Sequence, residues 1–203
     1  MKRGARRTRF LCGAAIWSFL APAVFATATA PAALRFVEPS QISGAMRVID
    51  VRAENLCTKG SLPGARCLPA SELFDGEGRP VSFHVLRWLL GTVGLTGHEQ
   101  VLVVAEHVAD ATAVGGLLIL AGEHEVAVLE RPVAIPADAP GGNPRSTTRE
   151  TVFTAPMRDR LLATGTEATG GSLIDAGRPF DRLRTFARRY ADGMQPMQLR
   201  LFP

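Results

Sequence analysis

Short apolar runs alternate with helix-like apolar patterns between residues 47 and 129. The runs cover 47–51 (RVIDV), 101–105 (VLVVA) and 125–129 (EVAVL), and they are rich in β-branched residues. Between them, apolar residues recur at helical spacing over 82–94, and 111–122 forms a second helical pattern. Apolar strands that alternate with helices are typical of a parallel sheet covered on both faces. We therefore predict an α/β fold with a central parallel sheet flanked by helices, with its site at the carboxyl ends of the strands.

The segment before the first run predicts one more strand and one short helix. Residues 33–37 begin the folded chain, and Ser40 is a candidate N-cap for a helix over 41–46. After the first run, the Gly/Pro-rich stretch KGSLPGARCLP (59–69) predicts an irregular connection.

The first thirty residues have the features of a secretory signal peptide. A basic stretch is followed by an apolar run of 16 residues and by small residues at A-x-A spacing, with cleavage expected near Ala26, Ala28 or Ala30. A membrane-spanning helix needs about 20 apolar residues, and this run contains Pro22. We predict a periplasmic or secreted protein that meets the membrane only transiently, through the signal peptide; an N-terminal membrane anchor is the alternative.

The net charge argues against a nucleic-acid-binding protein. The chain has 23 Lys and Arg against 19 Asp and Glu, but five of the basic residues lie in the first ten positions. Without that segment, 18 basic residues face 19 acidic ones, so the remaining protein is nearly neutral. Such a protein has no overall attraction for a polyphosphate.

The composition changes again after residue 132. Residues 133–149 are rich in Pro and Gly and predict an extended linker, and 150–203 predict a small C-terminal appendage of helices and a strand. Residues 145–203 carry a net charge of +4, whereas 31–144 carry −5. We expect this basic tail to dock on the acidic domain; the alternative is a solvated basic helix.

Two cysteines remain after signal-peptide removal, Cys57 and Cys67. In an oxidising compartment paired cysteines tend to form disulfides. The spacing permits a bridge, and two separate buried thiols are the alternative.

Two motifs in the first half of the chain resemble the rhodanese-like sulfurtransferase family. The family has a strand that ends in Asp-x-Arg and then a Gly-His-Ile-Pro-Gly-Ala stretch. The matching residues here are Asp50, Arg52, Gly60, Pro63, Gly64 and Ala65, with Ser61 in place of His and Leu62 in place of Ile. The likeness spans residues 35–132, which we assign as a rhodanese-like domain (31–132). It implies an α/β domain with a central parallel sheet.

The resemblance also implies a chemistry that this sequence departs from. Rhodaneses carry sulfur as a cysteine persulfide, at the end of a strand like 101–105 and in a positively charged loop. Here the cysteine position is occupied by Ala105 or, with a shift of one residue, Glu106, and no persulfide can form on either. The rest of this degenerate loop is His107, Asp110 and Thr112. Its charge is reversed, because Glu106 and Asp110 stand where the family tends to have arginine.

Four alternative interpretations stay open. Cys57 or Cys67 could act as a relocated persulfide cysteine. Glu106, His107 and Asp110 could perform acid–base chemistry or bind a cation. Residues 150–203 also share an order of elements with the first domain: an extended start, a short helix and a strand that ends in Asp. Asp175 and Arg178 are in the matching positions, and the segment could be a truncated second rhodanese-like repeat or a chance likeness. Finally, the chain could be a purely structural domain in an exported complex.

We therefore expect an exported rhodanese-like protein that is catalytically inactive, binding an unidentified protein partner or small ligand through an acidic pocket at Glu106, His107 and Asp110. A thiosulfate or persulfide sulfurtransferase is the competing hypothesis. We expect no cofactor and no metal; Glu123, His124 and Glu125 are adjacent and are expected in a solvated loop.

Overall fold

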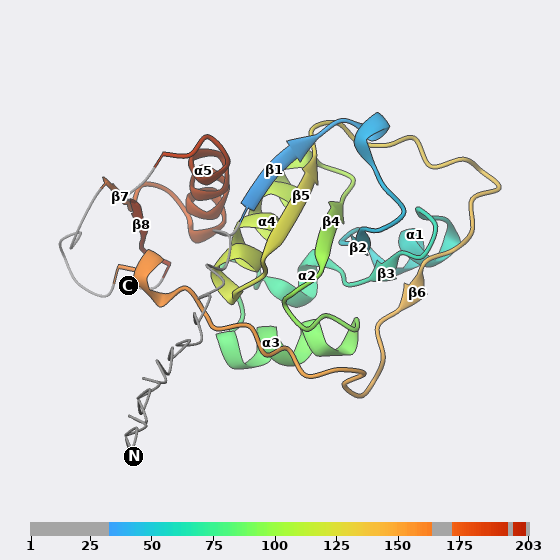
Figure 1. Cartoon of the computed structure of the whole chain (residues 1–203), viewed down its shortest axis with the longest axis horizontal. Coiled ribbons are helices and arrows are strands. Elements are labelled where there is room, and N and C mark those ends of the chain that lie inside the picture. Colours follow the sequence, from blue (N-terminus) through green and yellow to red (C-terminus); the bar gives the residue numbers. More distant parts are fainter. Residues whose placement is uncertain (1–32, 164–171, 195–196, 202–203) are drawn as a thin grey trace, which may run out of the picture. The chain divides into compact units, whose positions relative to one another are not determined.

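The predicted strands lie side by side in one parallel sheet. The computed structural model describes residues 33–163, 172–194 and 197–201. Six strands are arranged in the order β1-β5-β4-β2-β3-β6, and every neighbouring pair is parallel (Figure 1). The strands are β1 (Ala33–Val37), β2 (Arg47–Asp50), β3 (Arg66–Cys67), β4 (Gln100–Val104), β5 (Glu125–Leu129) and β6 (Asn143–Pro144). The prediction of an α/β fold with a central parallel sheet is confirmed.

In these described ranges, five α-helices and two 3-10 helices connect and follow the strands. The α-helices are α1 (Glu54–Lys59), α2 (Ala70–Leu73), α3 (Phe83–Thr92), α4 (Val108–Ala121) and α5 (Pro179–Ala191). The 3-10 helices are η1 (Pro39–Gln41) and η2 (Asp159–Leu161), and a separate two-stranded parallel sheet pairs β7 (Ser172–Ile174) with β8 (Met197–Leu199). Within the described residues, none of these helices has the length and apolar character needed to cross a membrane.

Alternate residues of each central strand enter different cores, because successive side chains of a strand point to opposite faces. Ile49 of β2 and Val103 of β4 lie in the larger core with residues of α2, α3, α4 and α5. Val48 and Leu102 lie in the smaller core on the other face, which the segment around Ile42 and the turn at Leu62 help to cover. One face of the sheet is therefore covered mainly by helices and the other largely by irregular segments.

Helix α4 is buried along most of its length, because the sheet lies on one side of it and α5 on another. Its two adjacent glycines make both contacts close. A Cβ on Gly115 would lie 2.7 Å from Val128 of β5, and a Cβ on Gly116 would lie 3.0 Å from the Leu183 carbonyl oxygen of α5. The tail thus packs directly on the central domain through α5.

Several local predictions need correction. The helix expected over 41–46 is absent: η1 starts earlier, at Pro39, and Ile42 at its end is already extended. Proline fixes the φ angle that a first helical residue needs, and Glu38 and Gln41 form a capping box that Ser40 does not join. In the linker at 133–149, which was expected to be extended, β6 also adds an edge strand next to β3.

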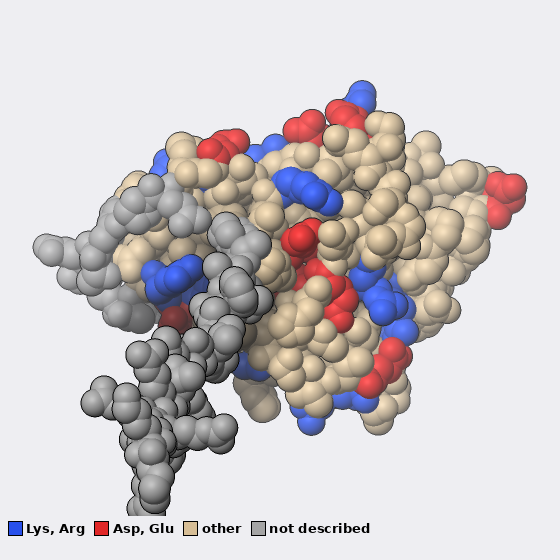
Figure 2. All heavy atoms as spheres, in the orientation of Figure 1, with Lys and Arg blue, Asp and Glu red and all other residues tan. Residues whose placement is uncertain are grey.

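Residues 31–203 form one compact unit. The proposed boundary at residue 150, and the idea of a second repeat with Asp175 and Arg178, stay predictions. Asp175 forms ion pairs with Arg182 and Arg200, at 3.3 Å and 2.6 Å, while Arg178 pairs with Asp181 at 3.4 Å. On the face drawn in Figure 2, basic and acidic side chains are interspersed among uncharged residues.

Candidate functional site

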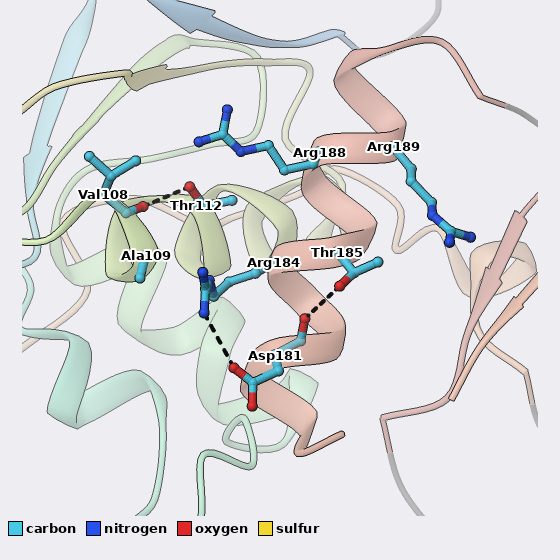
Figure 3. Close-up of a pocket in the computed structure, with 8 residues that line it drawn as sticks. All are labelled: Val108, Ala109, Thr112, Asp181, Arg184, Thr185, Arg188 and Arg189. Atoms are coloured by element: carbon cyan, nitrogen blue, oxygen red, sulfur yellow. Dashed lines mark hydrogen bonds and ion pairs between the residues drawn. The ribbon is translucent and has the colours of Figure 1, made fainter. Parts of the chain in front are cut away.

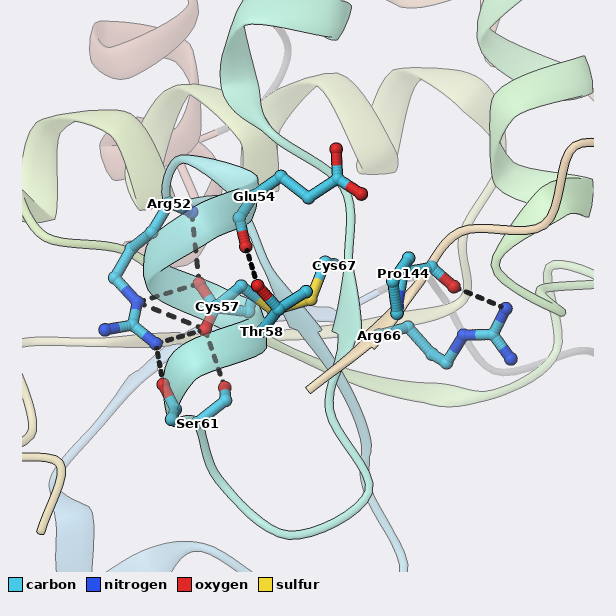
Figure 4. Close-up of a disulfide and its surroundings, with 10 residues drawn as sticks. Arg52, Glu54, Cys57, Thr58, Ser61, Arg66, Cys67 and Pro144 are labelled. Carbon is cyan, nitrogen blue, oxygen red and sulfur yellow. Dashed lines mark hydrogen bonds and ion pairs between the residues drawn. A yellow bond between two sulfur atoms is a disulfide. The ribbon is translucent and has the colours of Figure 1, made fainter. Parts of the chain in front are cut away.

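Asp50, the last residue of β2, is the centre of a buried hydrogen-bond network. Its carboxylate is fully buried and accepts hydrogen bonds from the Arg52 backbone N–H at 3.0 Å, from Arg52 Nη2 at 2.6 Å and from Ser61 Oγ at 2.6 Å. Arg52 Nη2 also donates to the Gly60 carbonyl oxygen at 2.6 Å (Figure 4). The network fastens the end of β2 to the turn that precedes β3.

The motif residues that follow build this turn. Gly60 caps α1 and Ala65 is buried, while Pro63 is exposed and Gly64 has a φ of 74°. Ser61 is itself buried and its hydroxyl is used by Asp50. In the described part of the chain, the residues of this motif therefore form the turn that packs against Asp50 and Arg52.

The disulfide between Cys57 of α1 and Cys67 of β3 lies beside this network (Figure 4). Both cysteines are buried, because the backbone before β6 passes directly over them. A Cβ on Gly142 would lie 2.5 Å from the Cys57 sulfur and 2.9 Å from the Cys67 sulfur. The sequence left open a disulfide or two separate buried thiols, and the structure contains the disulfide.

We expect Cys57→Ala/Cys67→Ala to lower the free energy of unfolding by about 2.8 kcal/mol, the chain-entropy value for closing a loop of about 11 residues; the cysteines are 10 positions apart. Urea unfolding of the variant and of the oxidised protein measures this difference. Unfolding the wild type with reductant in the urea should remove the difference. Equal stability of the variant and the oxidised protein would contradict the expectation that the bridge restrains the unfolded chain.

The connection from β4 to α4 consists of Ala105, Glu106 and His107. Glu106 and His107 are exposed, Ala105 is half-buried, and His107 is the N-cap of α4 without a side-chain cap bond. Asp110 lies in the first helical turn, where a carboxylate interacts favourably with the helix dipole. Thr112 is buried, and its hydroxyl donates to the Val108 carbonyl oxygen at 2.6 Å.

Electrostatics link this connection to the Asp50 network. The pKa of Arg52 is raised, first by its hydrogen bonds to Asp50, against the opposing effect of burial, and further by the negative charges of Asp50 and Glu106. Asp50 pairs with Val104 in parallel register, so Arg52 and Glu106 both follow their strands at the same edge of the sheet, as the sequence predicts for residues that follow neighbouring parallel strands.

A cavity of about 630 Å³ lies between the first turns of α4 and helix α5 (Figure 3). Its lining residues are Val108, Ala109, Thr112, Asp181, Arg184, Thr185, Arg188 and Arg189. Of the predicted loop residues, only Thr112 lines it, and its wall contains more basic than acidic side chains. Sequence reasoning missed this cavity because five of its eight lining residues come from α5, far along the chain.

Glu123 is a further residue that the sequence placed wrongly. Instead of lying in a solvated loop it is fully buried, between α4 and β5. Its Oε1 accepts from the His124 backbone N–H at 3.2 Å, whereas its Oε2 has no hydrogen-bond partner among the described residues. Burial raises the pKa of Glu123 to about 8. In the same described ranges, no group of three or more His, Cys, Asp or Glu side chains is placed to hold a metal ion.

Comparisons with known proteins identify the fold. No family model and no curated protein matches the sequence. Among solved structures, SseA from Escherichia coli, a 3-mercaptopyruvate sulfotransferase described as having the "Rhodanese" fold, matches with a TM-score of 0.51 and 15% identity over 64% of this chain and 59% of its own. EanB in complex with ergothioneine matches with a TM-score of 0.50 and 19% identity over 68% of this chain and 39% of its own.

A third solved structure, YnjE, has a TM-score of 0.48 and 21% identity, over 60% of this chain and 31% of its own. This chain thus spans from about a third to three fifths of the lengths of the three solved proteins that it resembles. The likeness to SseA and EanB shows that the chain has the rhodanese fold.

Proposed function

We propose that this chain is an exported binding module built on the rhodanese fold and that it does not transfer sulfur through a persulfide. The observation that carries this proposal is that the structure offers no accessible thiol at this edge of the sheet among the described residues. Cys57 and Cys67 are buried and joined to each other, and the connection Ala105–His107 after β4 contains no cysteine. A persulfide cycle requires an accessible thiolate.

The charge at the same edge of the sheet supports the proposal. A thiolate and an anionic sulfur donor are both negative, so a site for them needs uncompensated positive charge. Here the Arg52 guanidinium is already paired with Asp50 at 2.6 Å, and the charge of Glu106 acts on it as well. The exposed Glu106 and His107, with Asp110 beside them, suit recognition of a protein partner or small ligand that carries hydrogen-bond donors.

Intact mass of the purified protein tests the sulfur chemistry directly. We expect no change in mass after incubation with thiosulfate, and a gain of two hydrogens when the protein is unfolded in reductant, which opens the Cys57–Cys67 bridge. The same spectrum locates the N-terminus, expected after Ala26, Ala28 or Ala30 when the protein is recovered from the exported fraction.

The competing sulfurtransferase requires a different result. There a reduced Cys57 or Cys67 thiolate attacks the sulfane sulfur of thiosulfate, sulfite leaves with the electron pair of the broken S–S bond, and the protein gains one sulfur atom. A gain of that mass in the native protein, reversed by reductant and absent from Cys57→Ala/Cys67→Ala, would overturn the proposal. For the binding role, Ala substitution of Glu106, His107 and Asp110 should weaken capture of a partner; unchanged capture would argue against this surface.

A further inference from the structure

The cavity between α4 and α5 has one wall formed by a pair of arginines. Arg184 and Arg188 are four residues apart on α5, and Figure 3 shows both side chains extending toward the first turns of α4, whereas Arg189 points away from them. Among the described residues, Asp181 is the only acidic one that lines the cavity, against three arginines. The lining therefore carries a net positive charge.

The two arginines differ in how they are held. The Arg188 guanidinium stacks on the Phe36 ring of β1, 3.7 Å from the ring centroid, and forms no ion pair among the described residues. Stacking orients the guanidinium but leaves the N–H groups at its edge free to donate. Arg184 pairs with Asp181 only at 3.3 Å, and the same carboxylate also serves Arg178 at 3.4 Å. A stronger anion can compete for Arg184.

The opposite wall is the start of α4, represented by Val108, Ala109 and Thr112. The first hydrogen bonds at this helix start are those from the N–H groups of Asp110 and Ala111 to the His107 carbonyl oxygen. His107 provides no side-chain cap, so the preceding N–H groups, of Val108 and Ala109, have no hydrogen-bond partner within the described residues. The side chains of Val108 and Ala109 are apolar, and the Thr112 hydroxyl is already used within the helix.

We propose that this cavity binds a small organic molecule that carries a tetrahedral dianionic group, such as a phosphate monoester, on an apolar body. Arg184 and Arg188 would donate to the anionic oxygens, as arginine does in phosphate sites, and the apolar body would lie against Val108 and Ala109. The volume of about 630 Å³ exceeds that of an inorganic anion and is within the range of small-molecule sites. The inference deepens the proposed binding role, since it names a ligand class and a second surface for it.

Calorimetric titration of the purified full chain with phenyl phosphate at pH 7.5 tests the proposal. We expect binding that Arg184→Gln/Arg188→Gln weakens at least about tenfold, since two charge-assisted contacts are lost. The matched control is Arg149→Gln/Arg160→Gln, which removes the same charge at two exposed arginines outside the cavity and should bind as the wild type does. Phenol and inorganic phosphate, which each supply half of the probe, should both bind more weakly than phenyl phosphate.

A second variant keeps the test decisive if the arginine variant does not fold. Ala109→Glu places a carboxylate in the first turn of α4, where the helix dipole favours it, and its charge should abolish phenyl phosphate binding. The proposal is overturned if phenyl phosphate does not bind, if the control variant loses as much affinity as the arginine variant, or if phenol binds equally well. It is also overturned if the chain sediments with phosphatidylglycerol vesicles while phenyl phosphate has no effect, because the anion recognised would then be a lipid headgroup. None of these results depends on sulfur transfer, so they are independent of the thiosulfate experiment.

Discussion

Asp50→Asn is expected to lower the free energy of unfolding by about 4 kcal/mol, the middle of the range for removing one partner of a buried ion pair. The Asp50 side chain is completely inaccessible and that of Arg52 is 13% exposed. The amide would leave the guanidinium without its counter-charge and at least one of the donors that now bind the carboxylate, on Arg52 or Ser61, without an acceptor. For a domain of this size the midpoint of thermal unfolding should fall by about 10 °C. Thermal and urea unfolding measure both quantities.

Asp75→Asn is the matched control. Asp75 also pairs with an arginine, Arg79, at 2.8 Å, but both side chains are about half exposed. Solvent screens an exposed pair, which therefore contributes little to stability, so the control should differ little from the wild type. If Asp50→Asn were as mild as Asp75→Asn, the Asp-x-Arg motif would not hold the turn that we assign to it. A double-mutant cycle with Ser61→Ala isolates the hydroxyl contact, and we expect the two substitutions to be non-additive.

The centre of the fold could be predicted from the sequence because its signals are local. The runs that form β2, β4 and β5 are apolar and rich in β-branched residues, which is the composition expected of strands in a parallel sheet that is buried on both faces. Asp50 and Glu106 could be placed at one edge of that sheet for the same reason, since the carboxyl ends of parallel strands lie together. The structure confirms the sheet.

The missed elements depend on contacts between distant segments. Strands β3 and β6 are two residues long each, and Arg66 and Cys67 pair with Asn143 and Pro144, which lie within the linker and far along the chain. Such a pair has no periodicity to detect. The cavity was missed for a similar reason, because α4 was expected to begin at residue 111 and its first turn, with Val108 and Ala109, meets arginines from a helix about 75 positions further along the chain.

The burial of Glu123 shows how tertiary packing overrides local polarity. The sequence GEHEV has three polar residues in a row, which favours a solvated turn. In the structure the segment around Ala155 and Pro156 packs over Gly122, where a Cβ would lie 2.5 Å from the Pro156 carbonyl oxygen. That segment comes from the C-terminal part of the chain and covers the residue next to Glu123. The burial of Glu123 could therefore not be predicted from the residues next to it in the sequence.

This burial predicts that Glu123 makes the folded protein less stable as the pH rises. Burial, the largest effect, and the charge of Glu99 raise the pKa of Glu123 to about 8, against the opposing effects of the His124 N–H and the Arg158 charge. Its ordinary pKa is 4.5, so below that pH it is protonated in both the folded and the unfolded state. Between 4.5 and 8 only the unfolded state ionises, which favours unfolding. From about pH 5 to about pH 8 this effect removes about 3.5 kcal/mol of stability.

Glu123→Gln removes the ionisable group and nearly keeps the shape of the side chain. We expect the variant to match the wild type within about 1 kcal/mol at about pH 5 and to be more stable by about 3.5 kcal/mol at about pH 8, measured by urea unfolding across this range. Glu130→Gln, at an exposed position just after β5, should follow the pH profile of the wild type. Parallel profiles for Glu123→Gln and the wild type would mean that the carboxylate is ionised in the folded protein, with Arg158 or water as its partner. A difference that grows with pH would instead establish Glu123 as a buried, neutral acid at the end of α4.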